Sequence, residues 1–183
     1  MKIFKYIIFY IFIILTLGNA REFNIKNTEN EVENLFCKNK YQYDEKTTLY
    51  LDDDVYMLPD KGQNEIHLIS DMHFIGKGNG AIIDYHKKEL SGIKFVFQDK
   101  NESLIFENII FRNSDALKFA PVPPYNAYEL IFAMTFYIPN DYNYHVKFKN
   151  CTFEDSNSLI ASVFKASNEY DDYQIEFNDC IFR

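Results

Sequence analysis

Stretches in which apolar and polar residues alternate recur through the second half of the chain. The segments 104–111, 146–153 and 175–182 share one template: an apolar residue, any residue, Phe, any residue, Asn or Asp, Ile or Cys, any residue, and Phe. Alternation with a period of two is typical of a strand with one buried face. The break at Asn or Asp indicates a tight bend, because both residues tolerate the left-handed backbone region. Each template therefore predicts two short strands joined by a bend.

The last two copies agree beyond the template. They begin 29 residues apart, at Val146 and Ile175, and the apolar pairs 130–131 and 159–160 each precede a template by 16 residues. With 159–165 as a further strand, one unit holds three strands, and equivalent strands should pair in parallel about 4.8 Å apart. This register stacks three pairs of residues: Phe148 on Phe177, Cys151 on Cys180, and Phe153 on Phe182.

The first two copies lie further apart, and the excess of 13 residues falls between Phe111 and Leu130. This stretch contains Ala-Pro-Val-Pro-Pro at 120–124. Proline cannot donate to a strand ladder, so it is not expected in a central strand. We predict a loop, including residues 120–128, that is inserted into a regular coil.

The first half fits the same plan less closely. Residues 47–58 predict two strands around an acidic turn, and three glycines within 76–80 predict a turn before a strand over 81–84. Residues 21–45 are mostly polar, hold a short helix around 29–37, and are interpreted as an N-terminal cap. The template is placed over the intervening segment by four equivalences: Ile69 with Phe106, Asp71 with Asn108, Met72 with Ile109, and Phe74 with Phe111.

These features resemble the right-handed parallel β-helix family, which has the pectin lyase-like fold. The resemblance lies in Leu-Tyr-Leu-Asp-Asp-Asp-Val-Tyr at 49–56, in Phe-Ile-Gly-Lys-Gly at 74–78 and in the Phe-x-Asn-Cys-x-Phe coils. It implies an all-β, right-handed parallel β-helix over residues 46–183, with about four coils and three strands per coil. The last template reaches the end of the sequence inside a coil, so we expect further coils beyond residue 183.

The family includes pectate lyases, polygalacturonases and non-catalytic surface proteins, and its fold alone does not define an activity. The enzymes' motifs are largely missing here, because the chain has no Trp and only Arg21, Arg112 and Arg183 as arginines. The acidic pair Asp171-Asp172 lies in one loop, where two carboxyls rarely face each other across a sugar bond. We therefore expect no catalytic residues.

The first twenty residues have the pattern of a secretory signal peptide. Lys2 and Lys5 precede an uncharged apolar run over 6–17, and Gly18 and Ala20 are the small residues before a cleavage site. The run is shorter than the roughly 20 residues that cross a bilayer, so a membrane anchor is not expected. We predict cleavage after Ala20 and a secreted or cell-surface protein.

The net negative charge of the chain makes some classes of binding partner unfavourable. The chain has 27 acidic residues against 19 Lys and Arg, a formal net charge of −8. Proteins that bind nucleic acids neutralise phosphates with Lys and Arg, so no nucleic-acid partner is expected. The acidic turn at Asp52, Asp53 and Asp54 could bind calcium, which takes oxygen ligands from clustered carboxylates. A solvated turn explains the same residues, and we favour it, so no cofactor is expected.

Tyrosines beside two predicted loops form the candidate carbohydrate contact. An aromatic ring can pack on a sugar while the Tyr hydroxyl stays in water. The candidates are Tyr125, Tyr128, Tyr142 and Tyr170. Packing of the same rings in the core or in the loops is the competing interpretation.

Cys151 and Cys180 occupy the same template position in adjacent coils. Their Cα atoms should lie about 5 Å apart, within disulfide range, but parallel side chains suit a ladder of free thiols equally well. Two N-glycosylation sequons begin at Asn101 and Asn150. We predict modification of Asn101, in a polar loop, and expect Asn150 to be a buried, stacked bend residue.

Together these observations favour a non-catalytic binding or structural protein that contacts a polysaccharide or a cell wall. A polysaccharide lyase or glycoside hydrolase of the same fold is the alternative, and a structural spacer module is the second alternative. Self-association is expected through the C-terminal edge at Phe177 and Phe182, because an uncovered parallel stack presents unpaired backbone groups.

Overall fold

The computed structural model describes most of the chain. The described residues are 20–38, 40–41, 44–52, 54–59, 63–86, 92–98, 102–114, 119–122, 127–130, 133–138, 144–156, 160–163 and 174–183, with the backbone alone at 63, 119–122, 127–130 and 160–163. Apart from Ala20, the predicted signal peptide therefore lies outside the described residues. Among the residues that are described, no helix is long and apolar enough to cross a membrane.

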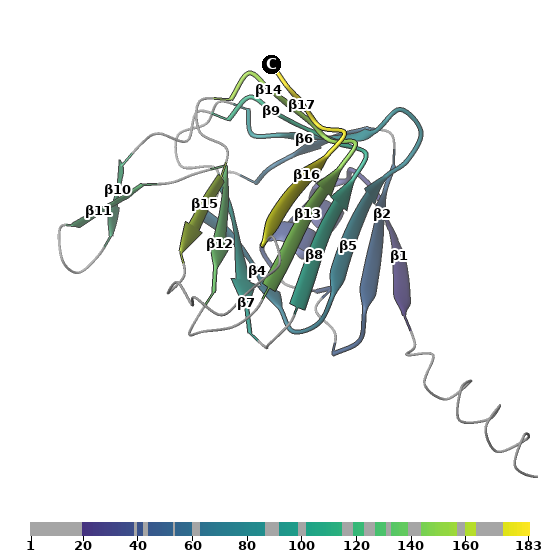
Figure 1. Ribbon diagram of the computed structural model, residues 1–183, viewed down its shortest axis with the longest axis horizontal. Coiled ribbons are helices and arrows are strands. Elements are labelled where there is room, and N and C mark those ends of the chain that lie inside the picture. Colours follow the sequence, from purple (N-terminus) through teal and green to yellow (C-terminus); the bar gives the residue numbers. More distant parts are fainter. Residues whose placement is uncertain are drawn as a thin grey trace, which may run out of the picture.

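Three parallel sheets wind around one core, as Figure 1 shows. Sheet A contains, in order, β1 (Arg21–Ile25), β2 (Thr47–Leu51), β5 (Met72–Gly76), β8 (Glu102–Glu107), β13 (Tyr144–Lys149) and β16 (Ile175–Asn178). Sheet B contains β3 (Val55–Met57), β6 (Ala81–Asp84), β9 (Ile109–Arg112), β14 (Thr152–Glu154) and β17 (Ile181–Phe182). Sheet C contains β4 (Gln63–Leu68), β7 (Gly92–Phe97), β12 (Met134–Tyr137) and β15 (Ile160–Val163). The chain visits the three sheets in turn, and the predicted parallel β-helix of about four coils is confirmed.

Pairing between the C-terminal coils follows the predicted 29-residue register. β13 pairs with β16 so that Phe148 is opposite Phe177, and β14 pairs with β17 so that Phe153 is opposite Phe182. β8 and β9 continue the same ladders toward the N-terminus. The register that the template predicts is therefore confirmed in sheets A and B of these coils.

The register predicted for the first half is wrong. Phe74 pairs with Phe106 in sheet A, whereas the sequence alignment had placed it with Phe111. The physical reason is that the alignment matched the wrong corner of the coil, because Asp71 lies between β4 and β5, where the chain passes from sheet C to sheet A. The corner between sheets A and B, where Asn108 lies in the third coil, is in the second coil the four-residue loop from Lys77 to Gly80.

The register predicted for the third strand is also wrong. Met134 of β12 pairs with Ile160 of β15, whereas Ile131 was expected in that place. Leu130 belongs to β11 instead, and Ile131 lies outside the described residues. The connections that enter and leave sheet C differ in length between coils, so a pair of apolar residues at a fixed spacing does not determine this register.

Aromatic side chains stack between coils inside the β-helix. The stack in sheet A has ring-centroid distances of 5.2, 5.1 and 4.9 Å along Phe74, Phe106, Phe148 and Phe177. The stack in sheet B has distances of 5.2 and 5.0 Å along Phe111, Phe153 and Phe182. All of these rings except Phe177 and Phe182 are fully buried, and full burial of a Phe side chain contributes about 1.5–3 kcal/mol, so these rungs are a main source of stability.

The bend between sheets A and B is built in two ways. Asn108, Asn150 and Asp179 have positive φ values of 56°, 49° and 54°, as the template predicted. Gly76 precedes the loop in the second coil. A Cβ on Gly76 would lie 2.0 Å from the Asn108 backbone oxygen, so a side chain cannot fit there.

β1 and the helix α2 (Glu29–Phe36) form the N-terminal end. β1 pairs in parallel with β2 and adds one strand to sheet A. α2 begins after Thr28, whose hydroxyl accepts a hydrogen bond from the Glu31 N–H at 3.4 Å, and it contacts β4. The buried Tyr56 hydroxyl donates to the Ile25 carbonyl at 2.7 Å and so joins β1 to the first coil.

The insertion between β9 and β12 forms an antiparallel hairpin of β10 (Phe119–Val122) and β11 (Ala127–Leu130). Figure 1 shows it projecting from the stacked sheets. Pro121 lies in β10 opposite Tyr128. A two-stranded hairpin accommodates proline because both its strands have a free edge. The insertion lies where the sequence predicted it, and it adds a hairpin where a loop was expected.

Candidate functional site

The outer face of sheet A carries the main candidate site. Along β8 and β13, inward side chains are buried and outward ones are partly exposed in strict alternation. Because the strands are in register, the outward residues form rows that cross the coils. One row contains His73, Ile105, Lys147 and Glu176, and the next contains Ile75, Glu107, Lys149 and Asn178.

A hollow of about 520 Å³ lies where these strands bend toward sheet B, and we call it the trough. It crosses four successive coils from β5 to β16. Its lining consists of Ile75, Gly76, Gly78, Glu107, Asn108, Lys149, Asn150, Asn178 and Asp179. The trough therefore combines three amides, two carboxylates, one ammonium and one apolar side chain.

Three titratable side chains, Glu107, His73 and Lys149, lie together beside the trough. The Glu107 carboxylate lies 3.2 Å from His73 Nε2 and 3.8 Å from Lys149 Nζ. Burial lowers the pKa of His73; the Glu107 carboxylate opposes this shift, and the Lys149 ammonium adds to it. His73 is therefore favoured in its neutral form, while Glu107 and Lys149 supply the charges.

The bend asparagines form a ladder along one wall of the trough. Asn108 Nδ2 donates to the Gly76 carbonyl at 2.8 Å, and Asn150 Nδ2 donates to Asn108 Oδ1 at 3.1 Å. Asp179 occupies the next position but has no side-chain N–H with which to extend the ladder. The wall is thus ordered by side-chain bonds in addition to the β-ladders.

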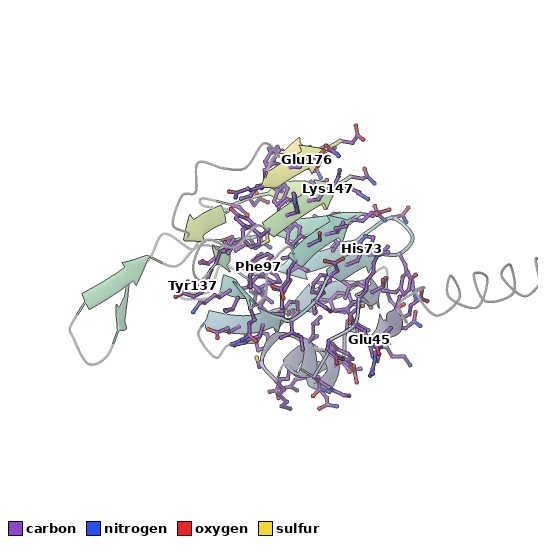
Figure 2. The ribbon with its side chains drawn as sticks, turned by 60° about the horizontal axis from the view of Figure 1, so that its bottom comes forward. Glu45, His73, Phe97, Tyr137, Lys147 and Glu176 are labelled. Atoms are coloured by element: carbon purple, nitrogen blue, oxygen red, sulfur yellow. The ribbon has the colours of Figure 1, made fainter. Side chains whose placement is uncertain are left out.

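A second, smaller hollow of about 230 Å³ lies on the same face. It is lined by Ser103, Ile105, His145, Val146, Lys147 and Glu176. Lys147 Nζ lies 2.8 Å from the Glu176 carboxylate, and these hydrogen-bonding and ionic interactions lower the pKa of Glu176. Figure 2 labels Lys147 and Glu176 on adjacent strands of this face, with His73 further along the same sheet.

Two of the three predicted calcium residues, Asp52 and Asp54, have protein partners in the structure. Asp52 Oδ1 lies 3.0 Å from Lys77 Nζ, and Asp54 Oδ1 accepts the Val55 N–H at 2.8 Å. Asp53 lies outside the described residues. Within the part of the chain that the structure describes, no group of three or more potential ligands could hold a metal ion.

The predicted tyrosine contact falls largely outside the described residues. Tyr125, Tyr142 and Tyr170 belong to segments that are not described, and only the backbone of Tyr128, in β11, is described. The predicted acceptor Asn101 is also outside them. These residues stay predictions.

Cys151 and Cys180 are free thiols at equivalent positions of adjacent coils. Each thiol donates to a carbonyl of the preceding coil, Cys151 to Phe106 at 3.6 Å and Cys180 to Phe148 at 3.5 Å. Burial raises the pKa of Cys151 to about 12. The structure thus has the free-thiol ladder, one of the two arrangements that the sequence left open.

The expectation that Asn150 is buried is wrong. Its side chain is exposed and lines the trough, although its position in the bend was predicted correctly. Glu107 and Lys149 also line the trough and were not predicted as site residues from the sequence. Their position in the sequence indicates an outward direction, because each immediately precedes the bend asparagine of its template.

Comparison of the chain with protein-family models, curated proteins and solved structures finds no match. The fold therefore defines the class, a parallel β-helix with a polar trough on one sheet. The pectin lyase-like family stays a resemblance carried by the coil motifs.

Proposed function

We propose that this protein acts outside the cell as a non-catalytic glycan-binding protein and that the trough of sheet A is its binding site. The observation that carries the proposal is the lining of the trough. A sugar hydroxyl both donates and accepts hydrogen bonds, so it needs acceptors and donors side by side. Asn108, Asn150 and Asn178 offer both, Lys149 donates, and Glu107 accepts.

The repeat of the β-helix suits a ligand that is itself a repeating chain. Lining residues occupy equivalent positions in successive coils, which are spaced by about 4.8 Å. The trough spans the three steps from Gly76 through Asn108 and Asn150 to Asp179, or roughly 14 Å at that spacing. Ile75 supplies the apolar surface at one end.

Charge favours a neutral glycan over a polyanionic one. The lining has two carboxylates, from Glu107 and Asp179, against the single ammonium of Lys149. The whole chain has a formal net charge of −8, which adds long-range repulsion of anions.

A glycan array tests the proposal with unglycosylated chain from a bacterial host. We expect binding to at least one neutral oligosaccharide, and a loss of at least about tenfold in affinity for Glu107→Gln and Lys149→Ala, as measured by calorimetry. Lys38→Ala is the matched control, because Lys38 lies after α2 and pairs with Glu33 at 2.9 Å. An affinity that is unchanged in both trough variants, or no binding to any glycan, would contradict the proposal.

The same sample separates a binding protein from an enzyme. The bound oligosaccharide is incubated with the protein, and its length is followed by mass spectrometry. An unchanged ligand agrees with a binding role. Shortened products would instead favour the lyase or hydrolase alternative.

A further inference from the structure

Asn150 combines a glycosylation sequon with an open environment. Asn150-Cys151-Thr152 matches the acceptor pattern Asn-x-Ser/Thr. Asn150 is exposed, whereas Cys151, which follows it, is fully buried. The sequon therefore starts at the surface of the β-helix and immediately enters its core.

The contacts of Asn150 are compatible with a glycan on its side chain. Its backbone N–H donates to the Asn178 carbonyl at 2.8 Å, which a side-chain modification leaves intact. Its Nδ2 makes one hydrogen bond, to Asn108 Oδ1 at 3.1 Å. An N-linked amide keeps one N–H, enough for this bond, and the second N–H, which makes no hydrogen bond among the described residues, is the one that the sugar would replace.

The surroundings of Nδ2 also suit the sugar itself. Asn150 lines the trough of about 520 Å³ together with Lys149, Asn178 and Asp179. These side chains donate to and accept from hydroxyl groups, so the first sugars of an attached glycan meet the same partners as an external ligand. A glycan at this position would occupy the trough.

We propose that Asn150 is an N-glycosylation acceptor and that its glycan occupies the trough, so that glycosylation controls access of other glycans. The occupancy of Asn150 is independent of the function proposed above, whereas the control of access rests on that function. In the transfer step, Asn150 Nδ2 forms a bond to C1 of an oligosaccharide carried on a lipid diphosphate. The bond from C1 to the phosphate oxygen breaks, the lipid diphosphate leaves, and Nδ2 loses one proton.

Occupancy is tested on the full chain secreted from a eukaryotic cell that supplies the lipid-linked donor. A second sample carries an additional cleavable leader, so that the sequon enters the secretory pathway whether or not residues 1–20 act as a signal. Enzymatic release of the glycan in ¹⁸O-water, followed by peptide mass spectrometry, identifies each modified asparagine. We expect a glycan at Asn150; secreted protein with an unmodified Asn150 peptide overturns the proposal.

Two variants of the same sequon control for folding. Thr152→Val removes the acceptor pattern but keeps Asn150 and a β-branched residue in β14, so it should be secreted without a glycan at Asn150. Thr152→Ser keeps the pattern and should retain the glycan. Asn101→Gln removes the other sequon and should leave the mass of the Asn150 glycopeptide unchanged.

Control of access is tested by binding of an array-selected oligosaccharide to the glycosylated chain and to Thr152→Val. We expect Thr152→Val to bind at least about tenfold more tightly, because its trough is free. Equal binding by both proteins would overturn the proposed location of the glycan and leave the binding function intact. No binding by either protein, with Asn150 modified, would overturn the binding function and with it the control of access, but not the acceptor assignment.

Discussion

The coils at the two ends of the β-helix reach the same geometry with different residues. In the C-terminal coils one template repeats, and Phe148 stacks on Phe177 with an interplanar angle of 7°. In the N-terminal coils Leu49 pairs with Phe74, and Phe74 is tilted by 24° against Phe106. Strand pairing and inward apolar positions are thus sufficient for the fold. Identical rungs add regular stacking but are not required.

The bends show the same contrast. The C-terminal coils turn with a single residue in the left-handed region, Asn108, Asn150 or Asp179. The second coil turns through the loop from Lys77 to Gly80 that follows Gly76. The two kinds of bend meet at one point, because the Asn108 side chain donates to the Gly76 carbonyl. Variants at this junction test whether the two solutions are interchangeable.

Gly76→Val should have the largest effect. An added Cβ would lie 2.0 Å from the Asn108 backbone oxygen and 2.6 Å from the Ala81 backbone nitrogen, and neither atom can move without breaking the ladder. We expect a loss of more than about 4 kcal/mol, with no cooperative thermal transition by circular dichroism. A folded Gly76→Val protein with an unchanged melting temperature would show that the second coil is not held in this register.

Phe148→Ala should have the next largest effect. The side chain is fully buried between Phe106 and Phe177, so its removal should cost about 3–5 kcal/mol in denaturant unfolding. Phe177→Ala is the matched comparison, because Phe177 is 41% exposed at the last rung. We expect it to cost less than half as much. Equal losses of unfolding free energy for the two variants would mean that a Phe stacked on both sides inside the β-helix contributes no more than a Phe at its exposed last rung.

The sequence predicted the regular coils better than the irregular ones, and for a physical reason. Where one residue forms each bend, spacing along the chain equals spacing around the helix, so Phe148 and Phe177 could be aligned directly. Where the corner between sheets A and B is a longer loop without the Asn or Asp bend, as between β5 and β6, the template is matched to Asp71 at another corner and Phe74 receives a shifted register. Lengthening a loop adds little to the entropy of closing it, so the loops between strands can differ in length from coil to coil.

The candidate site was predicted less well than the fold. The trough depends on side chains from four coils that meet only after stacking, and Glu107, Lys149 and Asn178 look like ordinary surface residues in the sequence. The exposure of Asn150 was missed because a ladder of amides was equated with burial. In the structure the Asn150 amide lies on the outer wall, where it can be ordered and exposed together.

Asn108→Ala should have an intermediate effect. It removes the bonds to Gly76 and from Asn150 and places a Cβ-bearing residue without local hydrogen bonds at a φ of 56°. We expect a loss of about 2 kcal/mol, roughly half from strain and half from the lost hydrogen bonds. Asn108→Gly separates the two parts, because glycine relieves the strain, and it should cost about 1 kcal/mol in the same unfolding assay. If both variants unfold alike, the backbone at Asn108 is not strained.

The smallest effect on stability is expected at the carboxylate of Asp84, which joins the second and third coils. Burial alone would raise the pKa of Asp84, but hydrogen bonds from Asn113, Arg112 and the His86 N–H outweigh it and lower the pKa below the usual range. Because the folded-state pKa lies below the unfolded one, the contribution of Asp84 is complete above the unfolded-state pKa. It is lost as pH falls from there through the folded-state pKa.

Asp84→Asn isolates this contribution. The amide keeps one acceptor oxygen, replaces the other with an NH2 donor, and loses the charge opposite Arg112, whose Nε lies 2.7 Å from Asp84 Oδ2. We expect a loss of about 1 kcal/mol at pH 7 and a difference from wild type that shrinks as the pH falls through the folded-state pKa of Asp84, measured by urea unfolding across pH. Glu154→Gln is the control between later coils, because Glu154 pairs with the more exposed Arg183 and should change stability less. A difference in unfolding free energy between Asp84→Asn and wild type that stays constant from pH 2 to pH 7 would show that the side chain of Asp84 stabilises the fold by its packing and not by its charge. The junction between the two kinds of coil would then depend on packing alone.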